Sequence, residues 1–198
     1  MTSLSIFPFS LIFILALLIP LGYTDATKTL SNDIINKTCQ ACSLIKSSNF
    51  SYGFCSATLA AIPVSHVTNL PGLGLISLEL ALVDATNTML KIDGMLTTNE
   101  SSLICKTCLD SCLELYSDMS AKLEECVGEY LSGGNEDVYS WISEMMQGTA
   151  LCEGEFEGIG LKSPLTRENY SLSQLYGMVL CIIDLISPII KSRPSISA

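Results

Sequence analysis

The chain has 198 residues, nine cysteines and a formal net charge of −10 at pH 7. An acidic chain does not follow nucleic acid phosphates, so nucleic acid is excluded as a partner. The acidity suits a basic protein partner, or it only keeps the chain soluble. With 48% hydrophobic residues, the chain is long enough to bury one substantial core.

The N-terminus has the pattern of a secretory leader. Residues 6–21 are apolar apart from Ser10, and small residues follow up to Ala26, although no basic residue precedes the apolar run. We expect a signal peptide over residues 1–26 and one mature domain over residues 27–198, with a retained membrane anchor as the weaker alternative. The mature protein is then secreted to the extracellular space or apoplast, with the vacuole as the alternative, and does not contact a membrane.

Four Asn-X-Ser/Thr triplets agree with secretion. We expect only some of them to carry glycan, and the candidate positions are Asn36, Asn49, Asn99 and Asn169.

The mature chain begins with two short helical pieces, over residues 31–46 and 52–61. Cys39 lies on the first piece and Cys55 on the second. A connector rich in proline and glycine follows over residues 62–72. This pattern predicts a small helical hairpin that precedes the main body of the domain.

Four longer stretches repeat apolar residues at alternating spacings of three and four, which is typical of helices packed nearly parallel in a bundle. The stripes are Leu75, Leu78, Leu82, Ala85, Met89, Ile92 and Leu96; Cys108, Cys112, Leu115, Met119, Leu123, Cys126 and Tyr130; Val138, Ile142, Met145, Thr149, Cys152 and Phe156; and Leu172, Leu175, Val179, Ile182 and Ile186. The breaks between them are short and polar or contain glycine and proline, so neighbouring helices are antiparallel. The sequence therefore predicts an all-α fold, an up-down-up-down four-helix bundle with an N-terminal helical hairpin extension. The apolar run over residues 175–190 contains Asp184 and ends near Pro188, and we interpret it as a core helix rather than a membrane tail.

Nine cysteines in a secreted chain indicate disulfides and at least one remaining thiol. Local geometry favours Cys39 with Cys55, across the N-terminal hairpin, and Cys112 with Cys152, across the second and third long helices. The others are interpreted as buried thiols or a further bridge, and they are Cys42, Cys105, Cys108, Cys126 and Cys181.

The sequence offers no evident catalytic apparatus. The two Cys-X-X-Cys motifs lie on helices, so neither structural zinc nor a thioredoxin-like site is expected. The one histidine, His66, lies in a loop and cannot build a catalytic triad by itself. We therefore expect no enzyme activity, no metal and no cofactor. Trp141, the one tryptophan, lies near an acidic turn and fits either a binding surface or the core.

The chain resembles the plant invertase and pectin methylesterase inhibitor family from about Ile34 to Ile186. The resemblance is carried by Thr38-Cys39 with Tyr52-Gly53-Phe54-Cys55, by Leu70-Pro71-Gly72-Leu73-Gly74, by Cys112-Leu113-Glu114-Leu115-Tyr116, and by Cys152-Glu153-Gly154-Glu155-Phe156. It implies a four-helix bundle with a hairpin extension and disulfides at Cys39–Cys55 and Cys112–Cys152. It also implies inhibition of a secreted carbohydrate-active enzyme by one-to-one docking.

The turn before the third long helix bears on the choice of target. Invertase inhibitors of this family often carry Pro-Lys-Phe there, whereas this chain has Gly133-Gly134-Asn135-Glu136-Asp137. The segment over residues 137–143 is similar to the pectin methylesterase inhibitors, while residues 163–168 are similar to members described as invertase inhibitors. We favour pectin methylesterase as the partner, with acid invertase as the alternative.

The hypothesis from the sequence is steric occlusion of the enzyme's substrate groove. The residues that we expect to contact the partner are Asn135, Asp137, Tyr139 and Ser143. Two other classes stay open: a small-ligand or lipid carrier, which needs an apolar cavity between the helices, and a secreted hydrolase, which lacks the usual nucleophile and base.

Overall fold

The computed structural model describes residues 34–45, 49–97 and 103–187. Within these residues there are helices and connecting turns but no strand. The predicted leader over residues 1–26 lies outside the described residues.

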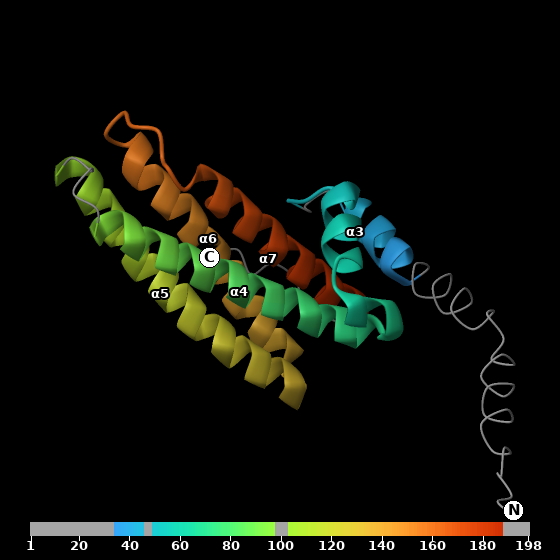
Figure 1. The fold of residues 1–198 in the computed structure, drawn as a ribbon. Helices are drawn as coiled ribbons and strands as arrows, with labels where there is room; N and C mark the ends of the chain where they lie inside the picture. The colour runs from blue at the N-terminus through green and yellow to red at the C-terminus, as the bar shows by residue number, and fades with distance from the viewer. Residues whose placement is uncertain (1–33, 46–48, 98–102, 188–198) are drawn as a thin grey trace, which may run out of the picture.

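Four long antiparallel helices form the bundle: α4 (Leu70–Thr97), α5 (Leu103–Ser132), α6 (Asn135–Glu157) and α7 (Thr166–Ile186). Helix α4 contacts α5 and α7, and α6 also contacts α5 and α7, so consecutive helices are neighbours and the last helix closes on the first. The prediction of an up-down-up-down bundle is confirmed (Figure 1).

The predicted stripes match the buried faces unequally. Every stripe residue of α6 is buried, whereas on α4 the buried face is rotated toward small residues outside the stripe, such as Gly74 and Ala81. The reason is a close helix contact. A Cβ at Gly74 would lie 2.2 Å from the hydroxyl oxygen of Tyr130, whose O–H donates to the carbonyl of Pro71 over 2.9 Å.

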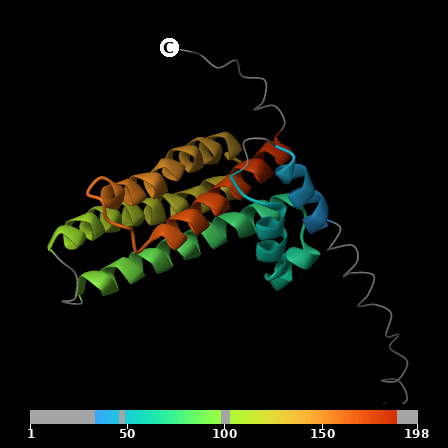
Figure 2. The ribbon, with the colours of Figure 1, turned by 90° about the horizontal axis from the view of Figure 1, so that it is seen from above.

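The N-terminal extension packs against one end of the bundle (Figures 1 and 2). It contains a helix over residues 34–43, helix α3 (Tyr52–Ala60) and the short 3₁₀ helix η1 (Pro63–Val67). Ser51 begins α3 as its N-cap, because its side-chain oxygen accepts a hydrogen bond from the N–H of Phe54 over 3.1 Å.

Three disulfides connect these parts. Cys39–Cys55 closes the N-terminal hairpin and Cys112–Cys152 joins α5 to α6, as expected from the sequence. Cys42–Cys181 is the further bridge that the sequence left open, and it joins the hairpin to α7 across 139 residues. The extension is therefore covalently tied to α7 of the bundle through Cys42–Cys181.

Helices α4 and α7 are long and apolar enough to cross a membrane by length and composition, among the described residues. Both pack within the bundle, and the buried side chains of α7 include Tyr176, Val179 and Ile183. Burial inside a helical bundle explains the apolar character of α7, as interpreted from the sequence.

Candidate functional site

The turn between α5 and α6 has a defined hydrogen-bonded geometry. Gly133 has φ +93°, the left-handed conformation that favours glycine. The N–H of Gly134 donates to the carbonyl of Glu129 over 3.0 Å, and the N–H of Gly133 donates to that of Tyr130 over 3.1 Å. This pair of bonds is a Schellman cap, which ends α5 and turns the chain directly into α6.

Helix α6 begins with acidic residues. Glu136 and Asp137 occupy its first turn, where negative charges interact favourably with the helix dipole. Gly134 is the N-cap and gives no side-chain hydrogen bond. Asp137 is exposed, so the turn presents a carboxylate to solvent at a fixed position.

The four predicted contact residues do not share one face of α6. With about 100° per residue, Asn135, Tyr139 and Ser143 follow one stripe beside α7, whereas Asp137 lies roughly 200° around the helix from Asn135. Asn135 Nδ2 donates to the Oγ of Ser187 over 3.4 Å, at the end of α7. The Ser143 hydroxyl donates to the backbone carbonyl of Tyr139 over 2.7 Å. The structure therefore brings three of the four together and separates Asp137 from them.

Tyr139 lines a hollow of about 190 Å³ between α6, α7 and the N-terminal extension, called the α7-side hollow below. Burial raises the pKa of the Tyr139 hydroxyl, and the negative charge of Asp184 raises it further. Asn49 reaches the same hollow and donates to the sulfur of Met146 over 3.3 Å. Met146, Leu180 and Asp184 also line this hollow and were not among the contact residues expected from the sequence. The spacing from Tyr139 and Ser143 to Met146, at helical intervals of four and three, was the signal that could have indicated Met146.

A second hollow of about 350 Å³ lies on the other flank of α6, against α5, and is called the α5-side groove below. Trp141 lines it and is half-buried. The ammonium nitrogen of Lys122 lies 4.6 Å from the centroid of the Trp141 ring, within the range of a cation–π contact. Trp141 is thus at the bundle surface rather than in the centre of the core.

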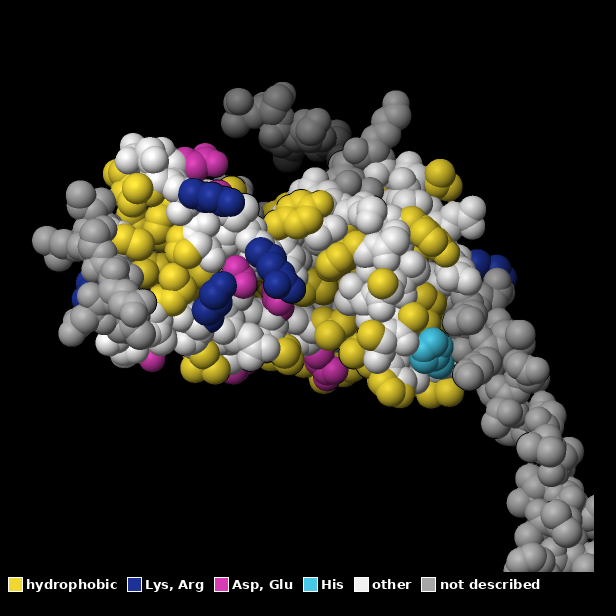
Figure 3. Space-filling model, turned by 45° about the horizontal axis from the view of Figure 1, so that its top comes forward, with side chains coloured by type: hydrophobic (Ala, Val, Ile, Leu, Met, Phe, Trp, Pro, Cys, Tyr) yellow, Lys and Arg dark blue, Asp and Glu magenta, His cyan; other side chains and the backbone are white. Residues whose placement is uncertain are grey.

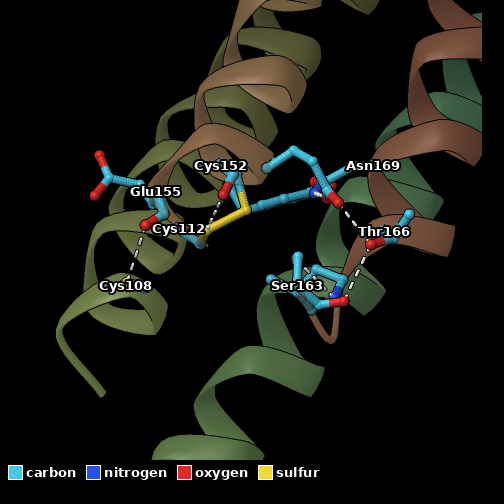
Figure 4. Close-up of a disulfide and its surroundings, with 10 residues drawn as sticks. Cys108, Cys112, Cys152, Glu155, Ser163, Thr166 and Asn169 are labelled. Atoms are coloured by element: carbon cyan, nitrogen blue, oxygen red, sulfur yellow. Dashed lines mark hydrogen bonds between the residues drawn. A yellow bond between two sulfur atoms is a disulfide. The ribbon is translucent and has the colours of Figure 1, made fainter. Parts of the chain in front are cut away.

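A hydrogen-bonded chain crosses the bundle beside the Cys112–Cys152 disulfide; Figure 4 labels this disulfide and Asn169, the middle residue of the chain. The hydroxyl of Tyr116 on α5 donates to Oδ1 of Asn169 on α7 over 2.8 Å, and Asn169 Nδ2 donates to Glu153 on α6 over 2.7 Å. Burial raises the pKa of Tyr116, and the nearby charges of Asp84, Glu168 and Glu153 add to the effect. The disulfide and this network hold α5, α6 and α7 in fixed register toward the end of the bundle opposite the α5–α6 turn.

The four candidate glycosylation sites separate in the structure. Asn36 is exposed and accepts a hydrogen bond from the Tyr52 hydroxyl over 3.1 Å, and Asn49 is exposed at the α7-side hollow. Asn99 lies outside the described residues. A glycan at Asn169 is at odds with the folded structure, because this side chain is 5% exposed and its nitrogen already bonds Glu153.

Cys105, Cys108 and Cys126 carry thiols. Burial raises the pKa of Cys108, and the Glu155 carboxylate and Cys105 add to the effect. The pKa of Cys126 is raised to about 12 by burial. Because the thiolate is the reactive form, the raised pKa values lower the reactivity of Cys108 and Cys126.

The described residues contain no group of three or more His, Cys, Asp or Glu side chains placed to hold a metal ion. His66 lies in η1, where its Nε2 is 2.8 Å from the carbonyl oxygen of Ala60. The candidate site thus consists of a capped turn, two hollows and the acidic first turn of α6 on a disulfide-braced bundle.

Comparisons with known proteins place this bundle in a family. Residues 33–182 match the family described as plant invertase/pectin methylesterase inhibitor. A protein of Platanus acerifolia named "Putative invertase inhibitor" is 31% identical over 185 residues, covering 93% of this chain and 96% of the relative. The pectinesterase inhibitor of Actinidia deliciosa is 28% identical over 178 residues, covering 89% of this chain and 91% of the relative.

Solved structures agree on the fold. The crystal structure of a mutant form of a pectin methylesterase inhibitor from Arabidopsis is 21% identical, with a TM-score of 0.63, and the match covers 73% of this chain and 95% of that one. The chain belongs to the plant invertase/pectin methylesterase inhibitor family. It is an inhibitor of one of these two kinds of enzyme and is not itself an enzyme.

Proposed function

We propose that this protein is a secreted inhibitor of plant cell-wall pectin methylesterase that docks one-to-one over the substrate groove of the enzyme. The turn between α5 and α6 carries the choice of target. It reads Gly133-Gly134-Asn135 where invertase inhibitors often have Pro-Lys-Phe, and its Schellman cap leaves no projecting loop. Occlusion of the groove keeps homogalacturonan methyl-esterified.

The bundle suits tight docking because it is ordered before it binds. The Cys112–Cys152 disulfide and the Tyr116–Asn169–Glu153 chain fix the helices, so little conformational entropy is lost on association. We infer that Tyr139 is the main anchor of the predicted contact set, with Asn135 as a polar contact on the same stripe nearer the turn.

Acid invertase is the second candidate target. It is supported by the name of the Platanus acerifolia relative and by the segment over residues 163–168. The carrier alternative is disfavoured, because Tyr116, Phe156 and Tyr176 are fully buried and fill the middle of the bundle where a ligand cavity would lie.

Secretion is supported by the predicted leader and by the three disulfides, which persist in oxidising compartments. We infer that the protein acts in the apoplast or cell wall, or in the vacuole if invertase is the target.

Parallel inhibition assays test the proposal. The purified, disulfide-intact protein is titrated into pectin methylesterase and into acid invertase at the same ionic strength and pH. We expect inhibition of pectin methylesterase at concentrations at which invertase keeps its activity. The reverse selectivity would show that invertase is the target. Full activity of both enzymes at micromolar inhibitor would refute the inhibitory function.

A further inference from the structure

The charge of the chain is concentrated on one helix pair. Helices α5 and α6 carry 12 of the 20 acidic residues and 2 of the 10 Lys and Arg residues, so they account for the whole net charge of −10. The face over α4, α7 and the N-terminal extension instead mixes Lys and Arg with Asp and Glu (Figure 3). A basic surface is therefore attracted to the α5–α6 side of the molecule in preference to the opposite side.

The α5-side groove lies within this acidic face. Its apolar lining includes Leu115, Met119 and Leu151, and Leu151 is 59% exposed. Two exposed carboxylates, Asp118 of α5 and Glu144 of α6, also line the groove. An apolar trough with carboxylates beside it matches a side chain that has an aliphatic stem and a cationic head.

The groove already holds a cation of this chain. The Lys122 ammonium lies over the Trp141 ring and is paired with Glu125 at the bundle surface. This contact shows that the Trp141 ring lies against a positive charge in this setting. Gly148 contributes to the depth of the groove, since a Cβ there would lie 2.9 Å from the sulfur of Met119.

We propose that the α5-side groove is the docking slot for an arginine side chain on a basic surface of the partner protein. Arginine fits better than lysine, because its planar guanidinium stacks on an aromatic ring and bonds carboxylates bidentately. The stem lies on Met119 and Leu151, and the guanidinium lies between Trp141 and the carboxylates of Asp118 and Glu144. The slot itself does not depend on the proposed inhibitory function. Only the identification of the partner as the target enzyme rests on that function.

Trp141 makes the slot directly observable, because it is the one tryptophan of the chain. Its fluorescence is followed while the purified protein is titrated with hexa-arginine, hexa-lysine or hexa-citrulline. We expect a saturable change with hexa-arginine, a weaker one with hexa-lysine and none with hexa-citrulline. An absent change with hexa-arginine, or identical curves for all three peptides, would overturn the proposal.

Matched variants separate the slot from the general negative charge. Asp118→Asn/Glu144→Gln removes the two groove carboxylates, and Glu79→Gln/Asp93→Asn removes two exposed carboxylates of α4. We expect at least tenfold weaker hexa-arginine binding for the first variant and less than twofold for the second. If the two variants weaken hexa-arginine binding equally, the binding depends only on net charge, and the proposal of a specific slot is refuted.

The same two variants are then assayed against whichever enzyme the wild-type protein inhibits. Loss of inhibition in the groove variant, with inhibition retained in the α4 variant, places the arginine on the target. Equal inhibition by both variants refutes that placement. If the wild type inhibits neither enzyme, the inhibitory function fails, while the peptide titration still decides whether the slot exists.

Discussion

The two flanks of α6 are built differently. The α7-side hollow is bordered by Tyr139, Met146 and Asp184, and the N-terminal extension covers part of it through Asn49. The α5-side groove is open along two bundle helices and has Trp141 and Glu144 beside it. One flank is a small recess at a junction of three segments, and the other is a charged trough on one helix pair. The same helix can therefore contribute shape on one side and electrostatic attraction on the other.

The first prediction concerns the disulfides that support the two flanks. The Cys42–Cys181 disulfide lies on the side of the α7-side hollow and closes the longest loop of the three disulfides. By the chain-entropy relation, its removal should lower the free energy of unfolding by about 5 kcal/mol. Removal of Cys112–Cys152, between the helices of the α5-side groove, should cost about 4 kcal/mol. Denaturant unfolding of the two variants, each with both cysteines of one disulfide changed to Ala, measures the two losses in free energy of unfolding. A larger loss for Cys112–Cys152 than for Cys42–Cys181 would contradict the ranking by loop length.

The second prediction concerns the Tyr116–Asn169–Glu153 hydrogen-bonded chain, which joins α5, α7 and α6. Tyr116→Phe leaves Oδ1 of the buried Asn169 without its donor, which should cost about 1–3 kcal/mol in denaturant unfolding. Tyr170→Phe is the matched control, because Tyr170 is 64% exposed, and it should leave stability unchanged. Equal stabilities of the two variants would argue against the network as a brace.

The third prediction tests the α7-side flank as a contact surface. Tyr139→Ala should weaken inhibition of the target about tenfold, since large aromatic side chains provide most binding hot spots. Ser143→Ala should change it less than twofold, because its hydroxyl is already bonded to the Tyr139 carbonyl. Inhibition constants of the two variants provide the test, and a larger loss for Ser143→Ala would reverse the assignment.

The fourth and smallest effect is a pH dependence that arises away from both flanks. Burial raises the pKa of Asp84 above 3.8, only partly opposed by its hydrogen bond with Ser171; the charge of Glu168 raises it further, and that of Arg167 lowers it. A raised pKa in the folded state means that the charged carboxylate destabilises folding. This penalty is absent below the unfolded pKa and complete above the folded one, so stability from this group decreases as pH rises between the two.

Glu168 changes stability in the opposite sense. Burial opposes its charge, but the hydrogen bonds from Lys91 and the backbone, with the charges of Lys91 and Arg167, lower its pKa overall. Its contribution is present above the unfolded pKa and is lost as pH falls through the folded pKa. Asp84→Asn should therefore raise the Tm near neutral pH and leave only the acid loss due to Glu168. A thermal melt series over pH checks this, and an unchanged Tm near neutral pH would contradict it.

Much of the scaffold could be predicted because its determinants are local in sequence. The stripe from Val138 to Phe156 identified the buried face of α6, and Cys112 and Cys152 lie on adjacent antiparallel helices. The stripe on α4 was less accurate, because Gly74 and Ala81 are buried to allow a close helix approach, and hydrophobicity alone favours the leucines beside them.

What could not be predicted depends on where distant segments meet. Cys42 and Cys181 are 139 residues apart, and no spacing rule pairs them. The triplet at Asn169 has the form of a glycosylation site, but its burial depends on Tyr116 and Glu153 from two other helices. The α5-side groove likewise needs the register of α5 against α6, which brings Lys122 onto Trp141.

The most direct test of the account is a stoichiometric titration of pectin methylesterase with the intact protein, at an enzyme concentration well above the dissociation constant. If inhibition is one-to-one, we expect pectin methylesterase activity to fall linearly with added inhibitor and to reach its minimum at one inhibitor per enzyme. The activity of acid invertase in the same buffer should not change. Undiminished pectin methylesterase activity at a several-fold excess of inhibitor would contradict it.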